Sequence, residues 1–290
     1  MTVCVAALAA HRRSIVCVAD KALSYGDYIQ WDSDSSKIIK LNPSGATLLV
    51  AGDEQSTARV MMHIKEISSR IGSGSSVKDM LTLCEQQYTK AFHELLENKL
   101  LRPRLLNKTT YTKAVAHSST NHIIRSLADE VSKFQINCDL LVCGFDTNRE
   151  PFIFHLESPG VGVDMTTTGF HAIGSGAEKA VSRLLFAEHK REHDIERVLF
   201  DAFDAKANAE MAVGVGYAWD ASIILGGKLG AEDVPIEIKE LIKKVWSRHN
   251  QSPFDSKIHT KGLEKGWRER LQEFSESVIL KKIRQSTSRK

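Results

Sequence analysis

The sequence has few of the features that mark specialised protein classes. Aromatic residues make up 7% of its 290 positions, and there are 6 prolines. No apolar run reaches the roughly 20 residues that a membrane-spanning helix needs, which excludes a helical membrane protein. We also expect no secretory signal, because charged residues directly follow the apolar residues 3–10. With 42% apolar and 26% charged residues, the composition is that of a globular protein.

Cysteine is scarce and unpaired in its spacing. The chain has 5 cysteines, an odd number, and each lies inside an apolar segment. Their spacing fits neither a disulfide framework nor a zinc site. We therefore expect a reduced, cytoplasmic protein with buried thiols.

Several familiar catalytic and cofactor motifs are also missing. There is no His-Glu-x-x-His, no paired Cys-x-x-Cys, no phosphate-binding loop and no Gly-x-Ser-x-Gly elbow. The segment Gly214-Val215-Gly216 is too short for a dinucleotide fingerprint. We expect neither a cofactor nor a metal. Cys4 or Cys17 remains open as a nucleophile, although both lie in apolar patterns where burial would raise the thiol pKa.

The net charge of +3 is too small to argue for nucleic-acid binding, but the charge is unevenly distributed. Residues 241–290 hold 13 Lys or Arg and 5 Asp or Glu, whereas residues 1–240 hold 26 and 31. The end of the chain is therefore basic and the rest acidic. A solvated helical face is the preferred interpretation, and contact with an acidic partner is the alternative.

Short apolar runs rich in β-branched residues predict strands in three blocks. The first block holds residues 3–8, 14–20 and 46–51, and the four-residue link at 10–13 predicts a hairpin. The second holds residues 138–144, 151–156 and 160–165, and the third holds 211–217 and 221–225. Continuous apolar character favours strands that are covered on both faces.

Helical periodicity fills the gaps between these blocks. Apolar residues at spacings of three and four predict helices over residues 60–71 and 77–95, and Ser76 with Asp79 is a start signal for the second of them. The same spacing predicts two more helices, one after residue 176 and one from about residue 194. The polar stretch 99–122 is predicted to be a loop or insertion. Helix pairs between strand blocks predict an α+β fold in which two sheets pack face to face with helices outside both.

The N-terminus offers a candidate nucleophile. Thr2 follows Met1, and its small side chain should allow an aminopeptidase to remove the methionine. The exposed α-amine, with an ordinary pKa of about 7.7–8.0, can then act as general base for the hydroxyl of its own residue.

Further motifs follow Thr2 in order. Asp20 ends the second strand, Lys37 opens the segment Lys37-Ile38-Ile39-Lys40-Leu41, and Gly52 closes an Ala-Gly turn. Ile173-Gly174-Ser175-Gly176 then precedes a helix. Over residues 2–226 this order resembles the proteasome β-subunit family of N-terminal-nucleophile hydrolases, and most closely bacterial proteasome-related proteins of unassigned role.

The resemblance implies a four-layer αββα sandwich over residues 1–232, followed by a basic helical extension at 233–290. It also implies roles for the five residues of the motifs. Thr2 is the nucleophile, Lys37 lowers the pKa of its hydroxyl, and Asp20 holds Lys37. The Gly52 N–H supplies the oxyanion hole, and Ser175 bonds the Thr2 amine.

The sequence departs from the family at one place. The family carries Asp-x-x-Ser-Gly before its last strand pair, and residues 209–216 contain no such pattern. Glu210 is a candidate substitute for the missing Asp, and Gly214 or Gly216 for the turn.

Three functions remain open. The first is a threonine-type peptidase that cleaves amide bonds, and the second is an amidase acting on small molecules by the same mechanism. The third is a non-catalytic proteasome-like subunit or assembly scaffold. The family forms rings, so we expect a homo-oligomer. The sequence indicates no membrane partner and gives no argument for nucleic acid, and it does not identify an ATPase or regulatory partner.

Overall fold

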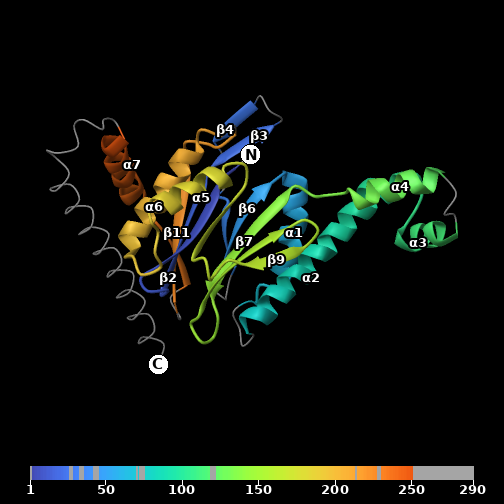
Figure 1. The fold of residues 1–290 in the computed structure, drawn as a ribbon, viewed down its shortest axis with the longest axis horizontal. Helices are drawn as coiled ribbons and strands as arrows, with labels where there is room; N and C mark the ends of the chain where they lie inside the picture. The colour runs from blue at the N-terminus through green and yellow to red at the C-terminus, as the bar shows by residue number, and fades with distance from the viewer. Residues whose placement is uncertain are drawn as a thin grey trace.

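The computed structural model describes residues 2–25, 29–32, 36–41, 46–69, 71, 76–117, 122–212, 214–226 and 230–250. Within these ranges it is a mixed α/β protein with two five-stranded antiparallel sheets, one separate hairpin and seven α-helices (Figure 1). None of the helices in this part of the chain is both long and apolar enough to cross a membrane.

The first sheet contains the N-terminal strand at its second position. Its order is β10 (Phe170–Ile173), β1 (Cys4–Ala9), β2 (Ser14–Asp20), β11 (Trp219–Leu225) and β12 (Gly230–Asp233). β1 and β2 form the predicted hairpin, with Cys4 paired to Ala19. All residues of both strands are buried, in agreement with their continuous apolar character.

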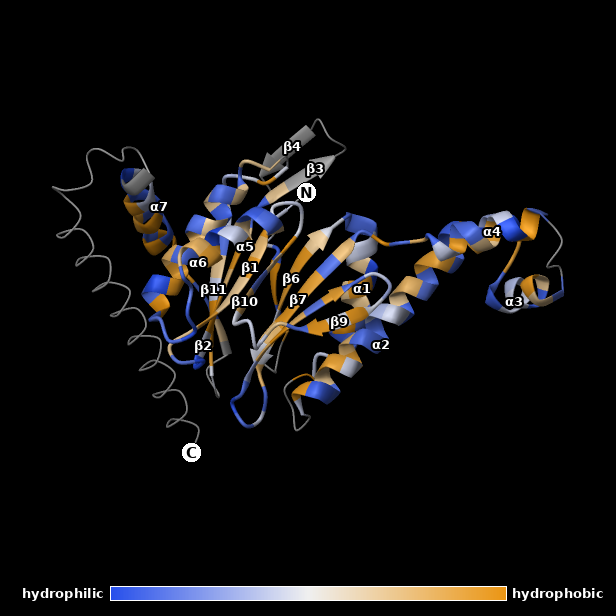
Figure 2. Ribbon diagram, in the orientation of Figure 1, coloured by the Kyte–Doolittle hydropathy of each residue, from blue (hydrophilic) through white to orange (hydrophobic). Residues whose placement is uncertain are grey.

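The second sheet is built around the middle of the chain. Its order is β5 (Ile38–Leu41), β6 (Ala46–Gly52), β7 (Cys138–Phe145), β8 (Pro151–Glu157) and β9 (Val161–Asp164). The separate hairpin joins β3 (Ala22–Tyr25) to β4 (Ile29–Asp32). Hydrophobic residues are concentrated along β6 and β7 (Figure 2).

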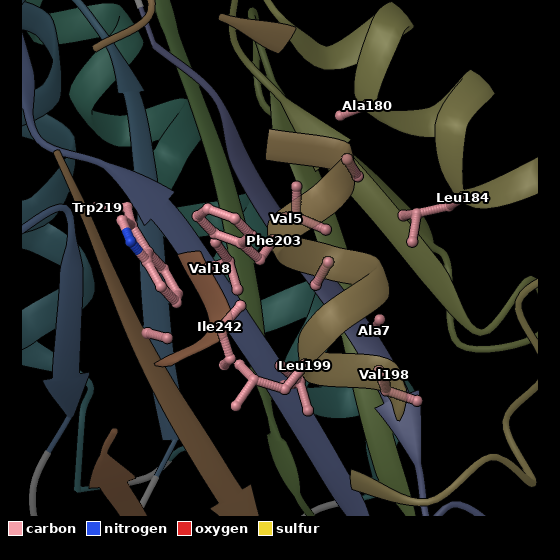
Figure 3. Packing of buried hydrophobic residues seen from close by; sticks show 14 of the residues in the cluster. Val5, Ala7, Val18, Ala180, Leu184, Val198, Leu199, Phe203, Trp219 and Ile242 are labelled. Atoms are coloured by element: carbon pink, nitrogen blue, oxygen red, sulfur yellow. The ribbon is translucent and has the colours of Figure 1, made fainter. Parts of the chain in front are cut away.

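The helices divide between the two sheets. α1 (Glu54–Glu66) and α2 (Val77–Leu96) share a buried cluster with β6, β7 and β8. α5 (Ala177–Phe186), α6 (Ile195–Ala209) and α7 (Ile236–Asn250) share another with β1, β2 and β11. In that cluster Phe203 packs on Trp219 with ring centroids 4.5 Å apart (Figure 3).

A third buried cluster contains side chains from both sheets. Leu8 and Ile15 of the first sheet join Leu49, Leu141 and Ile153 of the second. The first sheet therefore buries one face against α5, α6 and α7 and the other in contact with the second sheet.

Helix starts follow their local sequence signals. Asp53 caps α1 by accepting a hydrogen bond from the Ser56 N–H at 2.8 Å. Ser76 caps α2 by accepting one from the Asp79 N–H at 3.2 Å, which confirms the predicted start signal.

Two sequence predictions differ from the structure: the loop expected at 99–122, although the alternative of an insertion is not contradicted, and the strand expected at 211–217. Residues 99–117 and 122 are mainly helical, because α2 continues through a π-helical turn (Glu97–Leu101) and a 3₁₀ turn (Arg102–Arg104) into α3 (Lys108–His117), and α4 (His122–Ser132) follows. These helices extend away from the sheets (Figure 1), and α3 buries no side chain, so it has no apolar stripe to detect. Described residues between 211 and 217 form turns and bends after α6 rather than a strand.

The predicted extension begins inside the structure. α7 lies within residues 233–290 and packs Ile238, Ile242 and Val245 into the cluster with α6. The apolar stripe expected over residues 264–282 lies outside the described residues.

Candidate active site

Thr2 lies just before β1 and is 3% exposed. Its backbone N–H donates to Ser175 Oγ at 3.3 Å, and its carbonyl oxygen accepts the Gly176 N–H at 3.2 Å. Both partners belong to the turn between β10 and α5. Pairing of β1 with β10 thus brings residues 2 and 175 together across most of the sequence.

Lys37 connects the nucleophile candidate to a buried carboxylate. It lies immediately before β5, and its Nζ donates to both Thr2 Oγ1 and Asp20 Oδ1, the second at 2.9 Å. The Lys37 side chain is 12% exposed and that of Asp20 is fully buried. A cation in this position stabilises negative charge on the Thr2 oxygen.

Asp20 has hydrogen-bond donors on both carboxylate oxygens. Oδ1 accepts the Val3 N–H at 2.9 Å in addition to Lys37. Oδ2 accepts the Ala22 N–H at 3.0 Å and the Gly216 N–H at 3.1 Å. A buried charge needs this full set of partners, and the set fixes the carboxylate, which in turn orients Lys37.

Gly174 allows the close approach of the β10–α5 turn to Thr2. Its φ is +90°, and an added Cβ would lie 2.3 Å from the Thr2 carbonyl oxygen. Any side chain at position 174 would displace either the turn or the nucleophile candidate.

Gly52 lies at the end of β6 and is exposed. Its φ is +132°, and an added Cβ would lie 2.1 Å from the Asn137 carbonyl oxygen, so this position also requires glycine. Two residues earlier, the Val50 N–H donates to the Lys37 carbonyl at 3.2 Å, and the Cys4 thiol donates to the Val50 carbonyl at 3.6 Å.

The structure therefore brings four of the five predicted site residues into one hydrogen-bonded group: Thr2, Asp20, Lys37 and Ser175. Among the described residues no hydrogen bond links Gly52 to this group. Gly52 is connected to the group through β6, because Val50 on the same strand is hydrogen-bonded to Lys37 and to Cys4.

Sequence reasoning missed how residues 206–217 support the site. Lys206 is completely buried on α6, and its Nζ donates to Glu210 Oε1 at 2.6 Å and to the Tyr217 carbonyl at 2.9 Å. Burial lowers the pKa of Lys206, opposed by the nearby Glu210 carboxylate and by Asp20. These bonds hold the segment that carries Gly216 against Asp20.

The sequence contains signals for two of these contacts. Lys206 and Glu210 have the i, i+4 spacing of a helical ion pair, which was the available signal. Glu210, considered as a substitute for the missing Asp, binds Lys206. Gly216 supplies a backbone donor to the site.

The cysteines do not have the environment of nucleophiles. All five are free and buried. Burial raises the pKa of the Cys4 thiol far above its ordinary value, although Lys37 partly opposes this. A protonated thiol inside the core is inert.

Comparisons with known proteins add no assignment: no family model matches the chain, and no curated protein matches it.

Proposed function

We propose that the protein is a threonine-type hydrolase that cleaves amide bonds through Thr2 after Met1 has been removed. The observation that carries this proposal is the position of Lys37, whose Nζ donates to the Thr2 hydroxyl oxygen and to Asp20 at once. An ammonium group held on a threonine oxygen has a direct catalytic use, because it stabilises the alkoxide that attacks a carbonyl.

The first half of the proposed reaction forms an ester. The free Thr2 amine takes the hydroxyl proton, and Oγ1 attacks the substrate carbonyl carbon. Negative charge moves to the carbonyl oxygen, which the Gly52 N–H stabilises. The intermediate then expels the amine product, which receives the proton from the Thr2 amine, and the acyl group remains on Oγ1.

The second half repeats these roles with water. The Thr2 amine takes a proton from a water molecule, which attacks the ester carbonyl. The acid product leaves, and the proton returns to Oγ1. Ser175 Oγ accepts a hydrogen bond from the Thr2 nitrogen at 3.3 Å in the structure, and it would orient the free amine in both steps.

We also propose a layer arrangement for the fold and a cellular location for the protein. The three buried clusters support a four-layer αββα sandwich, because helices share two of them with one sheet each and the third contains both sheets. We propose that this is the fold of the N-terminal-nucleophile hydrolases, and that five free cysteines reflect a cytoplasmic location. Peptides and small amides are both candidate substrates.

We further propose that copies of the chain assemble through α5 and the end of α6. Large hydrophobic side chains are exposed there: Leu185 at 62%, Phe186 at 82% and Met211 at 79%. Phe186 and Met211 also line a hollow of about 510 Å³ between the two helices. The other residues that line the hollow are polar or charged, so the surface combines exposed apolar side chains with groups that can pair across a protein contact. A monomer in sedimentation at every concentration and salt tested would contradict assembly.

A non-catalytic subunit is the second candidate. The observation that favours it is the burial of Thr2, whose 3% exposure leaves little room for a substrate carbonyl. Such a protein would keep the hydrogen-bonded group as a structural element of the fold.

Hydrolysis of short fluorogenic peptide amides by the purified full chain separates the two candidates. Thr2→Ala should abolish hydrolysis, because alanine has no nucleophilic oxygen. Thr2→Ser is the matched control, since serine keeps the hydroxyl and the amine and should retain activity. Hydrolysis that persists in Thr2→Ala would overturn the proposal.

A further inference from the structure

A second group of polar side chains lies in the second sheet, near the start of β7 and the end of β8. Asp139, His155 and Glu157 each offer one ligand atom, and these atoms all lie within 4.8 Å of one another. Strand pairing creates the group: Leu140 pairs with Leu156 and Leu141 with His155, so Asp139 and Glu157 are neighbours across the two strands.

These side chains lie on the face that meets the first sheet. Leu141 and Ile153, two residues from Asp139 and His155 respectively, belong to the cluster that contains both sheets. Residues two apart on a strand share a face. From the first sheet, His171 on β10 approaches the group, and its ring centroid lies 4.8 Å from that of His155.

One nitrogen and two carboxylates of this group have no hydrogen bond within the described residues. His155 Nε2 is buried and has no hydrogen-bond partner in the described part of the chain. Neither the Asp139 nor the Glu157 side chain forms a hydrogen bond or an ion pair with another described residue. A buried polar atom such as His155 Nε2 is normally satisfied. Asp139 is half-buried and Glu157 is exposed, and two neighbouring carboxylates repel each other unless a cation lies between them.

A comparable group elsewhere differs in the state of its carboxylate. His189, His193 and Asp201 also have ligand atoms within 4.8 Å of one another. There, however, Arg197 Nε already contacts both Asp201 oxygens, at 2.9 and 2.8 Å. The carboxylate of that group has its cation, whereas those of Asp139 and Glu157 do not.

We infer that Asp139, His155 and Glu157 bind a divalent transition metal, with His171 of the facing sheet as the fourth ligand. Two imidazole nitrogens and two carboxylate oxygens suit tetrahedral zinc. Zinc–ligand bonds of about 2.0–2.1 Å place the ligand atoms of a tetrahedral site about 3.3 Å apart, so the atoms of Asp139, His155 and Glu157, now within 4.8 Å of one another, would move closer together. His171, whose contact with the group is through the His155 ring, would turn toward them.

The site would link the two sheets on strands that lead to the candidate active site. Asp139 pairs with Ala51, the residue before Gly52, and His171 precedes Ser175 by four residues. A bound metal would therefore tie β7 and β8 to β10 near both segments. This inference does not depend on the proposed hydrolase activity, because binding is measured without a substrate.

Zinc titration of the full chain tests the site. The protein is stripped with a chelator, dialysed and titrated with zinc chloride by calorimetry, and retained zinc is counted by mass spectrometry. We expect one zinc per chain and a higher melting temperature when it is bound. His155→Asn and Glu157→Gln should each weaken binding by at least about tenfold, because each removes a ligand.

His117→Asn is the matched control, because His117 is exposed on α3, away from the sheets, and should leave binding unchanged. Glu157 is also exposed, so Glu157→Gln should fold normally. Failure to bind zinc saturably would overturn the inference, as would stoichiometric binding that His155→Asn and Glu157→Gln leave intact. Unchanged affinity in His171→Asn would remove His171 as the fourth ligand.

Discussion

The Thr2 site and the Asp139–His155–Glu157 group differ in how their carboxylates are hydrogen-bonded. Asp20 accepts hydrogen bonds from Lys37 and from three backbone N–H groups. Among described residues, the carboxylates of Asp139 and Glu157 receive none. The first group therefore holds its own atoms in place, whereas the carboxylates of the second are left for solvent or for the metal proposed above.

The largest effect in this comparison is expected from Lys37. Lys37→Ala should lower amide hydrolysis by at least about 10²–10³-fold, as for other groups that stabilise charge in a transition state. Lys37→Arg should fail as well, because a forked guanidinium does not fit the place of a compact ammonium. Steady-state kinetics on fluorogenic amides measure both.

Lys40→Ala is the matched control, because Lys40 lies on the adjoining strand and pairs at the surface with Asp233. An unchanged rate in Lys37→Ala would remove Lys37 from the reaction.

Asp20 should have the largest effect on stability. Asp20→Asn leaves Lys37 without its buried counter-charge and turns an NH₂ group toward backbone donors. We expect the free energy of unfolding to fall by about 3 kcal/mol, as when one partner of a buried pair is removed. Urea denaturation followed by circular dichroism measures this change.

Asp220→Asn provides the comparison on the neighbouring strand β11. The Asp220 side chain is 22% exposed and pairs with Lys239 at 3.0 Å and with Lys21 at 3.9 Å. Because solvent reaches these pairs, their loss should cost about 1 kcal/mol, less than the loss at Asp20. Equal losses in the two variants would contradict the special role of the bonds around Asp20.

Ser175 is expected to have a moderate effect on activity. Ser175→Ala removes the hydroxyl that accepts the Thr2 N–H and should lower kcat/KM by about tenfold, the equivalent of one hydrogen bond. Ser132→Ala on α4, which also removes an exposed serine hydroxyl, should leave kcat/KM unchanged. An equal loss in both variants would indicate a general effect of the substitution instead of a role at Thr2.

The smallest effect on stability is expected for Glu157 in the Asp139–His155–Glu157 group. In chelator-treated protein, Glu157→Gln removes one of two neighbouring carboxylates that have no internal partner. We expect the free energy of unfolding to change by less than about 0.5 kcal/mol. A loss as large as that of Asp20→Asn would show that Glu157 has an internal role and would remove the contrast between the two groups.

The fold was predictable where burial is continuous. β1, β2, β6, β7 and β8 are apolar along nearly their whole length, so the sequence marks them clearly. β10 is only four residues long and includes His171, so its pattern is too short to read. The segment 211–217 was misread because apolar residues after α6 line a turn, in which Gly214 has a φ of +83°.

The candidate site was predictable only in part. Spacing alone does not connect residues 2, 20, 37 and 175, and the family resemblance supplied that link. The Gly216 N–H has no side-chain signature, and its contact with Asp20 depends on the fold of a segment held by Lys206. The second group was not predicted, because pairing of β7 with β8 assembles it from residues without a motif.

The most direct test of the account is the chemical state of Thr2. Purified protein would be treated with an electrophile that reacts with N-terminal threonine, digested and analysed by mass spectrometry. The account predicts that Met1 is absent, that the adduct lies on Thr2, and that Lys37→Ala prevents its formation. A retained Met1 in protein that hydrolyses amides, or an unmodified Thr2 in inactivated protein, would contradict it.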